Sequence, residues 1–392
     1  MRLKVLFAAI VFIVSGCPSD GAWAEQPALK EIPLGGVFDL TGPTSVLGRV
    51  YAQGAMDATA FLNQNGGING QPLRLAAEDY ASDPARAVAL YRKFKSVDKV
   101  FVLQGWGAAD TAALTPLVTK DRVVFLSASY DAGLADPRKA PYNFTIGATY
   151  SDQARLAMRW IKDNGGAKVC FVFPDHPFGR EPLAAGKEMA KKLGLEIGPD
   201  FTVGLRATDA VPQLLRLKEY DPDFAWLGGT TPSAAVIVRD AARLKLKTRF
   251  VLNVWAMDET LAQIAGEAVD GRVFGFMVAR PFGADIQAAA DIRTVAGDRS
   301  YPHLYNQAWA SLMVLAEGLK RAHSAGKLNG PGLKAALESL TDFTTGGLTP
   351  PLTYTSEDHR GTTACGLYTF KEGRLHLAAD LALERNKEHL GW

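Results

Sequence analysis

The chain has 392 residues, of which 47% are hydrophobic and 21% are charged, and its formal net charge is +2. A chain of this length and hydrophobic content can bury a large core, and we expect it to form two domains. Its basic residues are scattered rather than gathered in a run, which disfavours nucleic acid and other polyanions as partners.

The N-terminus has the pattern of an export signal. The basic start MRLK precedes an apolar run over residues 5–14, which is too short to span a bilayer and is typical of a secretory signal. Two cleavage sites fit. The small-x-small pattern AWA predicts a signal peptide over residues 1–24, whereas the lipobox-like VSGC predicts a signal over residues 1–16 and a lipid on Cys17. Both predict a periplasmic protein, free or lipid-anchored, and no later segment is apolar enough to cross a membrane.

Two further cysteines, Cys170 and Cys365, follow in the chain. One pair in so long a chain does not make a disulfide framework. Cys170 lies in AKVCFVF, which is typical of a buried strand. We expect two core thiols, with a bridge between them as the open alternative.

Strands and helices alternate through the first part of the chain. We expect strands at residues 32–42, 73–80, 99–105 and 122–129, with helices between them at 45–64, 83–95 and 110–120. The second of these helices opens on Asp83 as its cap and Pro84 at its first position. Pro116 lies inside the third helix, which must therefore kink or begin late. This alternation predicts a parallel sheet covered on both faces.

The same alternation restarts after residues 145–150, which join the two units. We expect helices at 151–166, 179–194, 210–223, 231–246 and 258–268, and strands at 167–175, 195–204, 224–229, 249–254 and 271–282. Residues 285–340 are mainly helical in pattern. The tail indicates a small antiparallel element with a hairpin turn at 371–373. The fold class is therefore α/β.

The sequence carries no catalytic or metal-binding motif. It has no phosphate loop, HExxH, CxxC or GxSxG pattern, and LGG at 227–229 lacks the remainder of a dinucleotide fingerprint. His176 and His359 lie in loops of interest, but a single loop histidine is usually only solvated. We therefore expect no cofactor, no metal and no enzyme activity.

Aromatic residues follow several of the expected strands. Trp106, Tyr130 and Trp255 stand at strand ends, and Phe178 lies just past another. Ligands of open parallel sheets bind beyond the carboxyl ends of the strands. One such aromatic is more often a lid on the core, but four in equivalent positions on two units favour a ligand cleft. Trp106 stands between two glycines, which we interpret as a bend that brings the backbone close to the ligand.

Three stretches carry a resemblance to a known family. They are GGINGQPLRL, the acidic strand end before Asp83 and Pro84, and FPDHPFGRE; the match runs in order from about residue 31 to the PLTY and DHRG tail. The chain resembles the type I periplasmic solute-binding proteins of ABC importers, in the leucine-binding-protein-like cluster that takes branched-chain amino acids, amides and urea. The resemblance implies a monomer that captures a small solute and docks to permease subunits in the inner membrane.

The resemblance also implies two Rossmann-like lobes with mostly parallel sheets, joined by a hinge of three crossings. Lobe 1 would comprise residues 31–149 and 279–349, and lobe 2 residues 150–278 and 350–386. The ligand would be trapped between the lobes when they close.

The binding positions of the amino-acid-binding members differ here. Those proteins hold the ligand carboxylate with a Ser and backbone amides after the third strand and with a Thr after the fourth, where this chain has Ala108 and Tyr130. Their second lobe offers a Glu to the ammonium group, where this chain has Val254 and Trp255. A buried ammonium without a partner would cost several kcal/mol. Asp258 is expected to cap a helix instead.

We therefore expect an aromatic or hydrophobic carboxylate as ligand, with its acid at the amides of residues 107–109, near a helix N-terminus that favours anions. Ser129 or Thr230 would add a hydroxyl donor. The candidate ligand-binding residues are Leu47, Trp106, Gly107, Ala108, Ala109, Ser129, Tyr130, Tyr150, Phe178, Thr230 and Trp255. The alternatives are a branched-chain amino acid, amide or urea binder, a ligand-sensing module, and a secreted enzyme. The export signal favours the importer.

Overall fold

The computed structural model describes residues 30–390, and the strands in this range form two separate sheets. The first sheet has the order β2-β1-β3-β4-β5, with every pair parallel. Its strands are β1 (Ile32–Phe38), β2 (Leu73–Asp79), β3 (Val102–Gly105), β4 (Val124–Ser127) and β5 (Asn143–Phe144). The expected α/β fold with mostly parallel sheets is confirmed.

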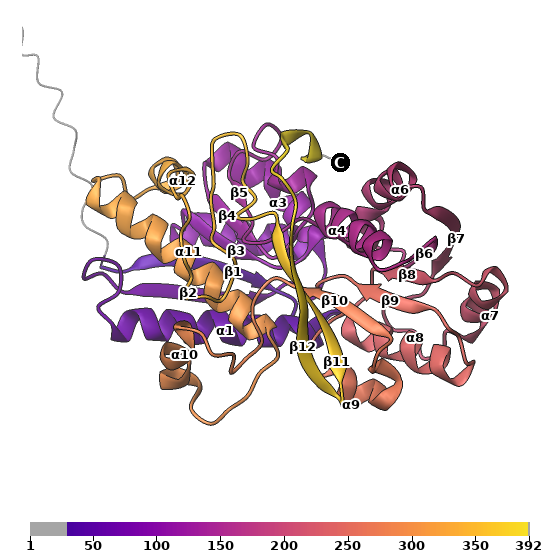
Figure 1. Cartoon of the computed structure of the whole chain (residues 1–392). Helices are drawn as coiled ribbons and strands as arrows, with labels where there is room; N and C mark the ends of the chain where they lie inside the picture. The colour runs from indigo at the N-terminus through magenta and orange to yellow at the C-terminus, as the bar shows by residue number, and fades with distance from the viewer. Residues whose placement is uncertain (1–29, 391–392) are drawn as a thin grey trace, which may run out of the picture.

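The helices around the first sheet come from two distant parts of the chain, and together with this sheet they form what we call the first half of the molecule. They are α1 (Ser45–Gln64), α2 (Pro84–Lys93) and α3 (Ala108–Asp121), joined later by α10 (Ala288–Ala296), α11 (Leu304–Ser324) and α12 (Gly330–Glu338). Helix α11 packs along α1, where the Tyr305 hydroxyl donates to the Asp57 carboxylate over 2.8 Å (Figure 1). A Cβ at Gly54 would collide with the Tyr305 backbone. The glycine thus permits the close approach of the two helices.

The second sheet has the order β12-β11-β10-β9-β8-β6-β7 in the part of the chain described. Its strands are β6 (Lys168–Phe173), β7 (Glu196–Thr202), β8 (Phe224–Leu227), β9 (Arg249–Leu252), β10 (Val273–Met277), β11 (Ala364–Lys371) and β12 (Arg374–Ala382). The antiparallel tail is thus not a separate element, because β11 pairs with β10 and extends this sheet toward the middle of the molecule (Figure 1).

The helices of the second half cover both faces of its sheet (Figure 1). They are α4 (Tyr150–Asp163), α5 (Pro177–Arg180), α6 (Pro182–Lys192), α7 (Val211–Tyr220), α8 (Thr231–Arg243) and α9 (Leu261–Ala265). The first turn of α4 forms a capping box, in which Thr149 accepts from the Asp152 backbone N–H over 3.1 Å. This cap fixes where the chain enters the second half.

The chain passes three times between the two halves: after β5, after β10 and before β11. Two of these crossings pair side by side, since the Thr145 N–H donates to the His359 carbonyl over 3.1 Å and the Gly361 N–H donates to the Thr145 carbonyl over 2.7 Å. A buried ion cluster lies next to this pairing. The guanidinium of Arg360 contacts Asp152 at 3.0 Å and Asp358 at 2.9 Å. The crossings are therefore held by charge as well as by backbone bonds.

Two local expectations differ from the structure. Helix α3 begins at Ala108 and runs through Pro116, so it does not begin late, and the alternative of a kink at the proline stays a prediction. The hydroxyls of Thr111 and Thr115, in the turns before the proline, each donate to a backbone carbonyl four residues earlier. Asp258 is not the cap of α9, because that helix begins three residues later; its carboxylate accepts from Thr260 and Thr231. The expected cap of α2 is confirmed, since Asp83 accepts from the Ala85 N–H over 2.8 Å.

The predicted signal peptide, over residues 1–24 or 1–16, and the candidate lipidation site Cys17 lie outside the described residues. Between residues 30 and 390, none of the helices combines the length and the apolar character that a membrane crossing requires. Cys170 and Cys365 are buried free thiols, so the alternative of a bridge between them is wrong. Burial raises the pKa of both thiols to about 12, which keeps them unreactive at neutral pH.

We predict that Arg360→Gln lowers the free energy of unfolding by about 3 kcal/mol, because it leaves Asp152 and Asp358 buried without their central partner. Denaturant unfolding followed by circular dichroism measures the loss. The matched control is Arg138→Gln, whose guanidinium pairs with Asp136 but is 70% exposed, and which should cost less than about 1 kcal/mol. Equal losses in both variants would show that the crossings do not depend on the buried cluster.

Candidate ligand-binding site

A cavity of about 40 Å³ lies between the two halves, at the carboxyl ends of strands from both sheets. We name it the inner cavity. Nine of the candidate residues line it, namely Leu47, Trp106, Gly107, Ala108, Ala109, Tyr150, Phe178, Thr230 and Trp255. The volume is only a few times the 10–15 Å³ or so that one water molecule requires. The lobes are therefore closed onto each other here.

Aromatic rings form the walls of the inner cavity and join the two halves. The ring centroid of Trp106, which follows β3, lies 5.1 Å from the ring centroid of Trp255, which follows β9. The indole N–H of Trp255 donates to the Tyr150 hydroxyl over 2.8 Å, and the Tyr150 ring lies 6.3 Å from that of Phe178. All four side chains are buried. Three of the four strand-end aromatics, Trp106, Phe178 and Trp255, thus line the inner cavity together with Tyr150, and their contact with a ligand stays a prediction.

Hydrogen bonds hold the Trp106 ring in place. Its indole N–H donates to the Thr44 hydroxyl over 2.9 Å, and this hydroxyl donates to the Asp39 carboxylate over 2.6 Å. Asp39 is fully buried and also accepts from the Ser82 hydroxyl and the Gly42 N–H. Asp39 thus holds the loops after β1 and β2 beside Trp106.

The glycines on either side of Trp106 serve packing rather than an unusual bend. A Cβ at Gly107 would lie 2.7 Å from the Asp110 carboxylate and 2.8 Å from the Tyr80 hydroxyl. A Cβ at Gly105 would collide with the Phe125 ring. The glycines therefore make room for Tyr80, Asp110 and Phe125 around Trp106. Gly107 also lines the inner cavity, and its approach to a ligand stays a prediction.

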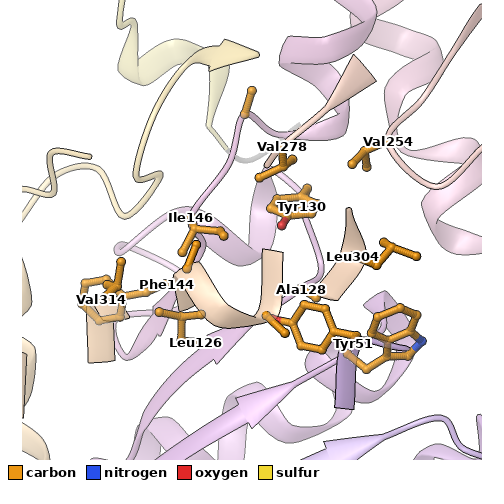
Figure 2. Packing of buried hydrophobic residues seen from close by; sticks show 14 of the residues in the cluster. Tyr51, Leu126, Ala128, Tyr130, Phe144, Ile146, Val254, Val278, Leu304 and Val314 are labelled. Atoms are coloured by element: carbon orange, nitrogen blue, oxygen red, sulfur yellow. The ribbon is translucent and has the colours of Figure 1, made fainter. Parts of the chain in front are cut away.

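Two candidate residues, Ser129 and Tyr130, do not line the inner cavity. Tyr130 is fully buried behind it, and its hydroxyl accepts from the Gln307 side chain over 2.6 Å. Figure 2 shows Tyr130 among buried apolar residues, beside Val278. Its ring supports that of Trp255 from the back, at 5.8 Å. Ser129 is buried, and its N–H donates to the hydroxyl of Ser127, so the end of β4 belongs to the core rather than to the cavity.

Four lining residues were not among the candidates: Thr44, Tyr80, Ser82 and His176. The first three follow β1 and β2, so the rule that places ligands at strand ends could have found them. His176 was noted only as a loop histidine. Burial lowers its pKa, so the ring is neutral at neutral pH. His359, by contrast, is structural, since it stacks at 3.9 Å on Phe144 and is fully buried.

The N-terminus of α3, where the ligand acid was expected, already holds an acid of the protein. Asp110 is fully buried in the first turn of this helix. Burial raises its pKa to about 7, against the opposing effect of hydrogen bonds from the Tyr80 hydroxyl and the backbone N–H groups of Trp106 and Gly107. A ligand carboxylate bound at residues 107–109 would therefore lie beside the buried carboxyl group of Asp110.

Two carboxylates of the second half reach across to the first and hold the closed arrangement. Glu181 accepts from the Ala132 N–H over 3.1 Å, and Glu259 accepts from the His303 N–H over 2.9 Å. Burial, with a contribution from nearby Asp131, raises the pKa of Glu181 to about 8. Hydrogen bonds and the charge of His303 outweigh burial and lower the pKa of Glu259.

The fold and the cavity define a two-lobed α/β protein with a small cavity between its two sheets. Residues 31–374 match the family described as periplasmic binding protein, and the chain belongs to this family. Members of the family bind small solutes and work with the permeases of ABC transporters, and this chain is a solute-binding component of the leucine-binding type. The resemblance found in the sequence is confirmed.

Individual relatives extend along most of the chain. The "Leu/Ile/Val-binding protein homolog 1" of Brucella abortus is 25% identical over 330 residues, which cover 82% of this chain and 85% of the relative. An ABC transporter substrate-binding protein of Aeropyrum pernix superimposes with a TM-score of 0.85 at 28% identity, over 92% of this chain and 97% of that one. A fatty acid ABC transporter substrate-binding protein of Thermomonospora curvata gives 0.81 at 21% identity, over 91% and 93%.

We predict that Glu181→Gln flattens the pH dependence of stability between about pH 4.5 and pH 8. The folded protein holds a proton on Glu181 up to about pH 8, whereas the unfolded chain releases it near 4.5. The wild type should therefore lose stability as pH rises through this window, and the variant should lose less. Thermal unfolding at several pH values measures this loss of stability in the wild type and in the variant.

The matched control for this prediction is Glu357→Gln, at a side chain that is 73% exposed. It should leave the pH profile of the melting temperature as in the wild type. A Glu181→Gln profile as steep as that of the wild type would show that this carboxyl group does not hold a proton in the closed protein.

Proposed function

We propose that this protein captures an aromatic or hydrophobic carboxylate outside the inner membrane and delivers it to the permease of an ABC importer. It is a monomer and not an enzyme, and it is located in the periplasm, free or anchored by a lipid on Cys17. The two lobes are the segments 31–149 with 279–349 and 150–278 with 350–386. The observation that carries the choice of ligand is the lining of the inner cavity.

That lining includes aromatic rings from both halves and, within residues 30–390, no aspartate or glutamate. A bound amino acid would bring an ammonium group into a closed, water-poor space with no carboxylate to pair with it. The lining histidine, His176, is neutral and offers no anion either. A ligand without a cationic group avoids this cost, and each ring that it covers adds about 0.5–1.5 kcal/mol beyond the area buried.

The small volume of the inner cavity indicates how the ligand fits. Because the rings of Trp106 and Trp255 are already in contact at 5.1 Å, a ligand ring would take the place of this contact when the lobes close. The single contact between the two indoles would be replaced by two contacts, one between each indole and the ligand ring. This exchange favours a flat ligand. A branched aliphatic group would fill the same space with less contact.

The second candidate is a branched-chain amino acid, which the name of the Brucella relative favours. Asp39 contacts Thr44 and Asp110 lies close to Gly107, but neither acid lines the inner cavity. An amino acid would need one of them to turn toward the ligand. The fatty acid transporter protein of the same fold is consistent with the first candidate, although its likeness extends to the fold alone.

We predict that aromatic carboxylates such as 3-phenylpropionate change the tryptophan fluorescence with a dissociation constant at least tenfold lower than that of leucine. Closure places the ligand against two indoles, so the emission should respond directly. Trp106→Phe should remove about half of the signal, because Trp255 remains against the ligand. Trp160→Phe, on α4 and away from the inner cavity, is the matched control and should retain it.

Tight binding of leucine or valine, with no response to the aromatic acids, would overturn the proposed ligand class and leave the branched-chain alternative. A quaternary ammonium probe belongs in the same panel, because rings without a carboxylate can also hold a cation. Its preference over the acids would likewise contradict the proposal.

A further inference from the structure

A second, larger cavity adjoins the inner one. Its volume is about 420 Å³, and it shares Thr44, Leu47 and Thr230 with the lining of the inner cavity. We name it the outer cavity. It lies between the loop that precedes α1 in the first half and the segment 205–208 with α8 in the second half. The two cavities together offer a path from the aromatic rings toward the surface.

The charged side chains that line the outer cavity are both arginines, Arg206 and Arg239. Both are exposed. Within the described range neither has an ion pair or a hydrogen bond, whereas Arg243 on the same helix pairs with Asp240 at 3.3 Å. Two cations without partners beside one cavity leave a net positive charge there.

The N-terminus of α8 adds to this charge. Thr230 and Pro232, at the start of the helix, line the outer cavity, and the first turn contains no acidic residue. The positive end of the helix dipole therefore faces the same space as the arginines. Asp258 lies near this end, but it is buried, accepts from Thr231 and Thr260, and lines neither cavity.

The remainder of the outer cavity is apolar enough to hold a carbon chain. Its walls include Leu205 and Val236 of the second half, and Val46 of the first half, whose side chain is 67% exposed. An extended solute could thus lie along apolar walls between the aromatic rings and the arginines. In the closed arrangement the inner cavity has about 40 Å³, whereas the outer cavity offers about 420 Å³ for the rest of an extended solute.

We propose that the outer cavity is a subsite for the anionic end of the ligand, and that Arg206 and Arg239 determine specificity for an elongated aryl or alkyl carboxylate. The apolar end lies between the lobes in the inner cavity, and the carboxylate pairs with the guanidinium groups, which suit its two oxygens. This inference rests on the proposed function. It moves the anion from the α3 terminus, where Asp110 stands, to the second half.

Isothermal titration calorimetry on the full chain tests the subsite with 5-phenylpentanoate and with the neutral 5-phenylpentanol. We expect the double variant Arg206→Gln, Arg239→Gln to bind the carboxylate at least tenfold more weakly than the wild type. Its affinity for the alcohol should change less than twofold. Added salt should weaken carboxylate binding in the wild type more than in the variant.

Two further variants complete the experiment. Arg243→Gln, on the same helix but outside the outer cavity, should bind as the wild type does. Asp110→Asn should leave carboxylate affinity within twofold; a gain of tenfold or more would place the anion at the α3 terminus and overturn the subsite. Both arginines are exposed, and thermal unfolding of each variant verifies that it is folded.

The results separate the two proposals. Unchanged carboxylate affinity in the double variant overturns the subsite but leaves the proposed function in place. A wild type that binds no carboxylate of the panel overturns the proposed function, and the subsite with it. An equal loss of affinity for the alcohol and the carboxylate would show that the arginines do not recognise charge, and would also overturn the subsite.

Discussion

The contact between Trp106 and Trp255 is the interaction on which the site depends. One ring comes from each half, and each is held by a hydrogen bond within its own half, to Thr44 for the first and to Tyr150 for the second. Closure therefore brings together two ordered walls and requires little further loss of side-chain freedom. A site prepared in this way keeps more of the free energy of ring contact for binding.

The acids around the cleft explain why so little negative charge reaches it. Asp39 accepts from the loops after β1 and β2, and Glu181 and Glu259 accept from backbone N–H groups across the two halves, while Asp110 is buried in the first turn of α3. The hydrogen bonds of Asp39 position one wall of the inner cavity, and those of Glu181 and Glu259 hold the closed arrangement. The acidic side chains of this region thus lie outside the cavity lining, and the lining itself is aromatic and uncharged.

The alternation of apolar strands and amphipathic helices made the fold predictable, and the rule of strand ends located most of the cavity lining. The position of Tyr130 was not predictable, because the sequence does not show that the end of β4 lies behind the Trp255 ring. Nor does it show that Asp39 contacts Ser82, 43 positions away, or that Thr44 contacts Trp106, 62 positions away. Long-range side-chain hydrogen bonds decide such details, and local patterns do not contain them.

The distribution of charge between the halves also sets the direction in which an amphipathic acid would lie. A carboxylate placed deep in the cleft would lose its water and meet Asp110, whereas in the outer cavity it keeps part of its hydration and faces Arg206 and Arg239. Desolvation of an anion costs several kcal/mol unless hydrogen bonds replace the water. The apolar end has the opposite preference, since it gains by leaving water. Both terms favour the ring inside and the acid outside, so a ligand with the charge next to its ring would satisfy only one of them.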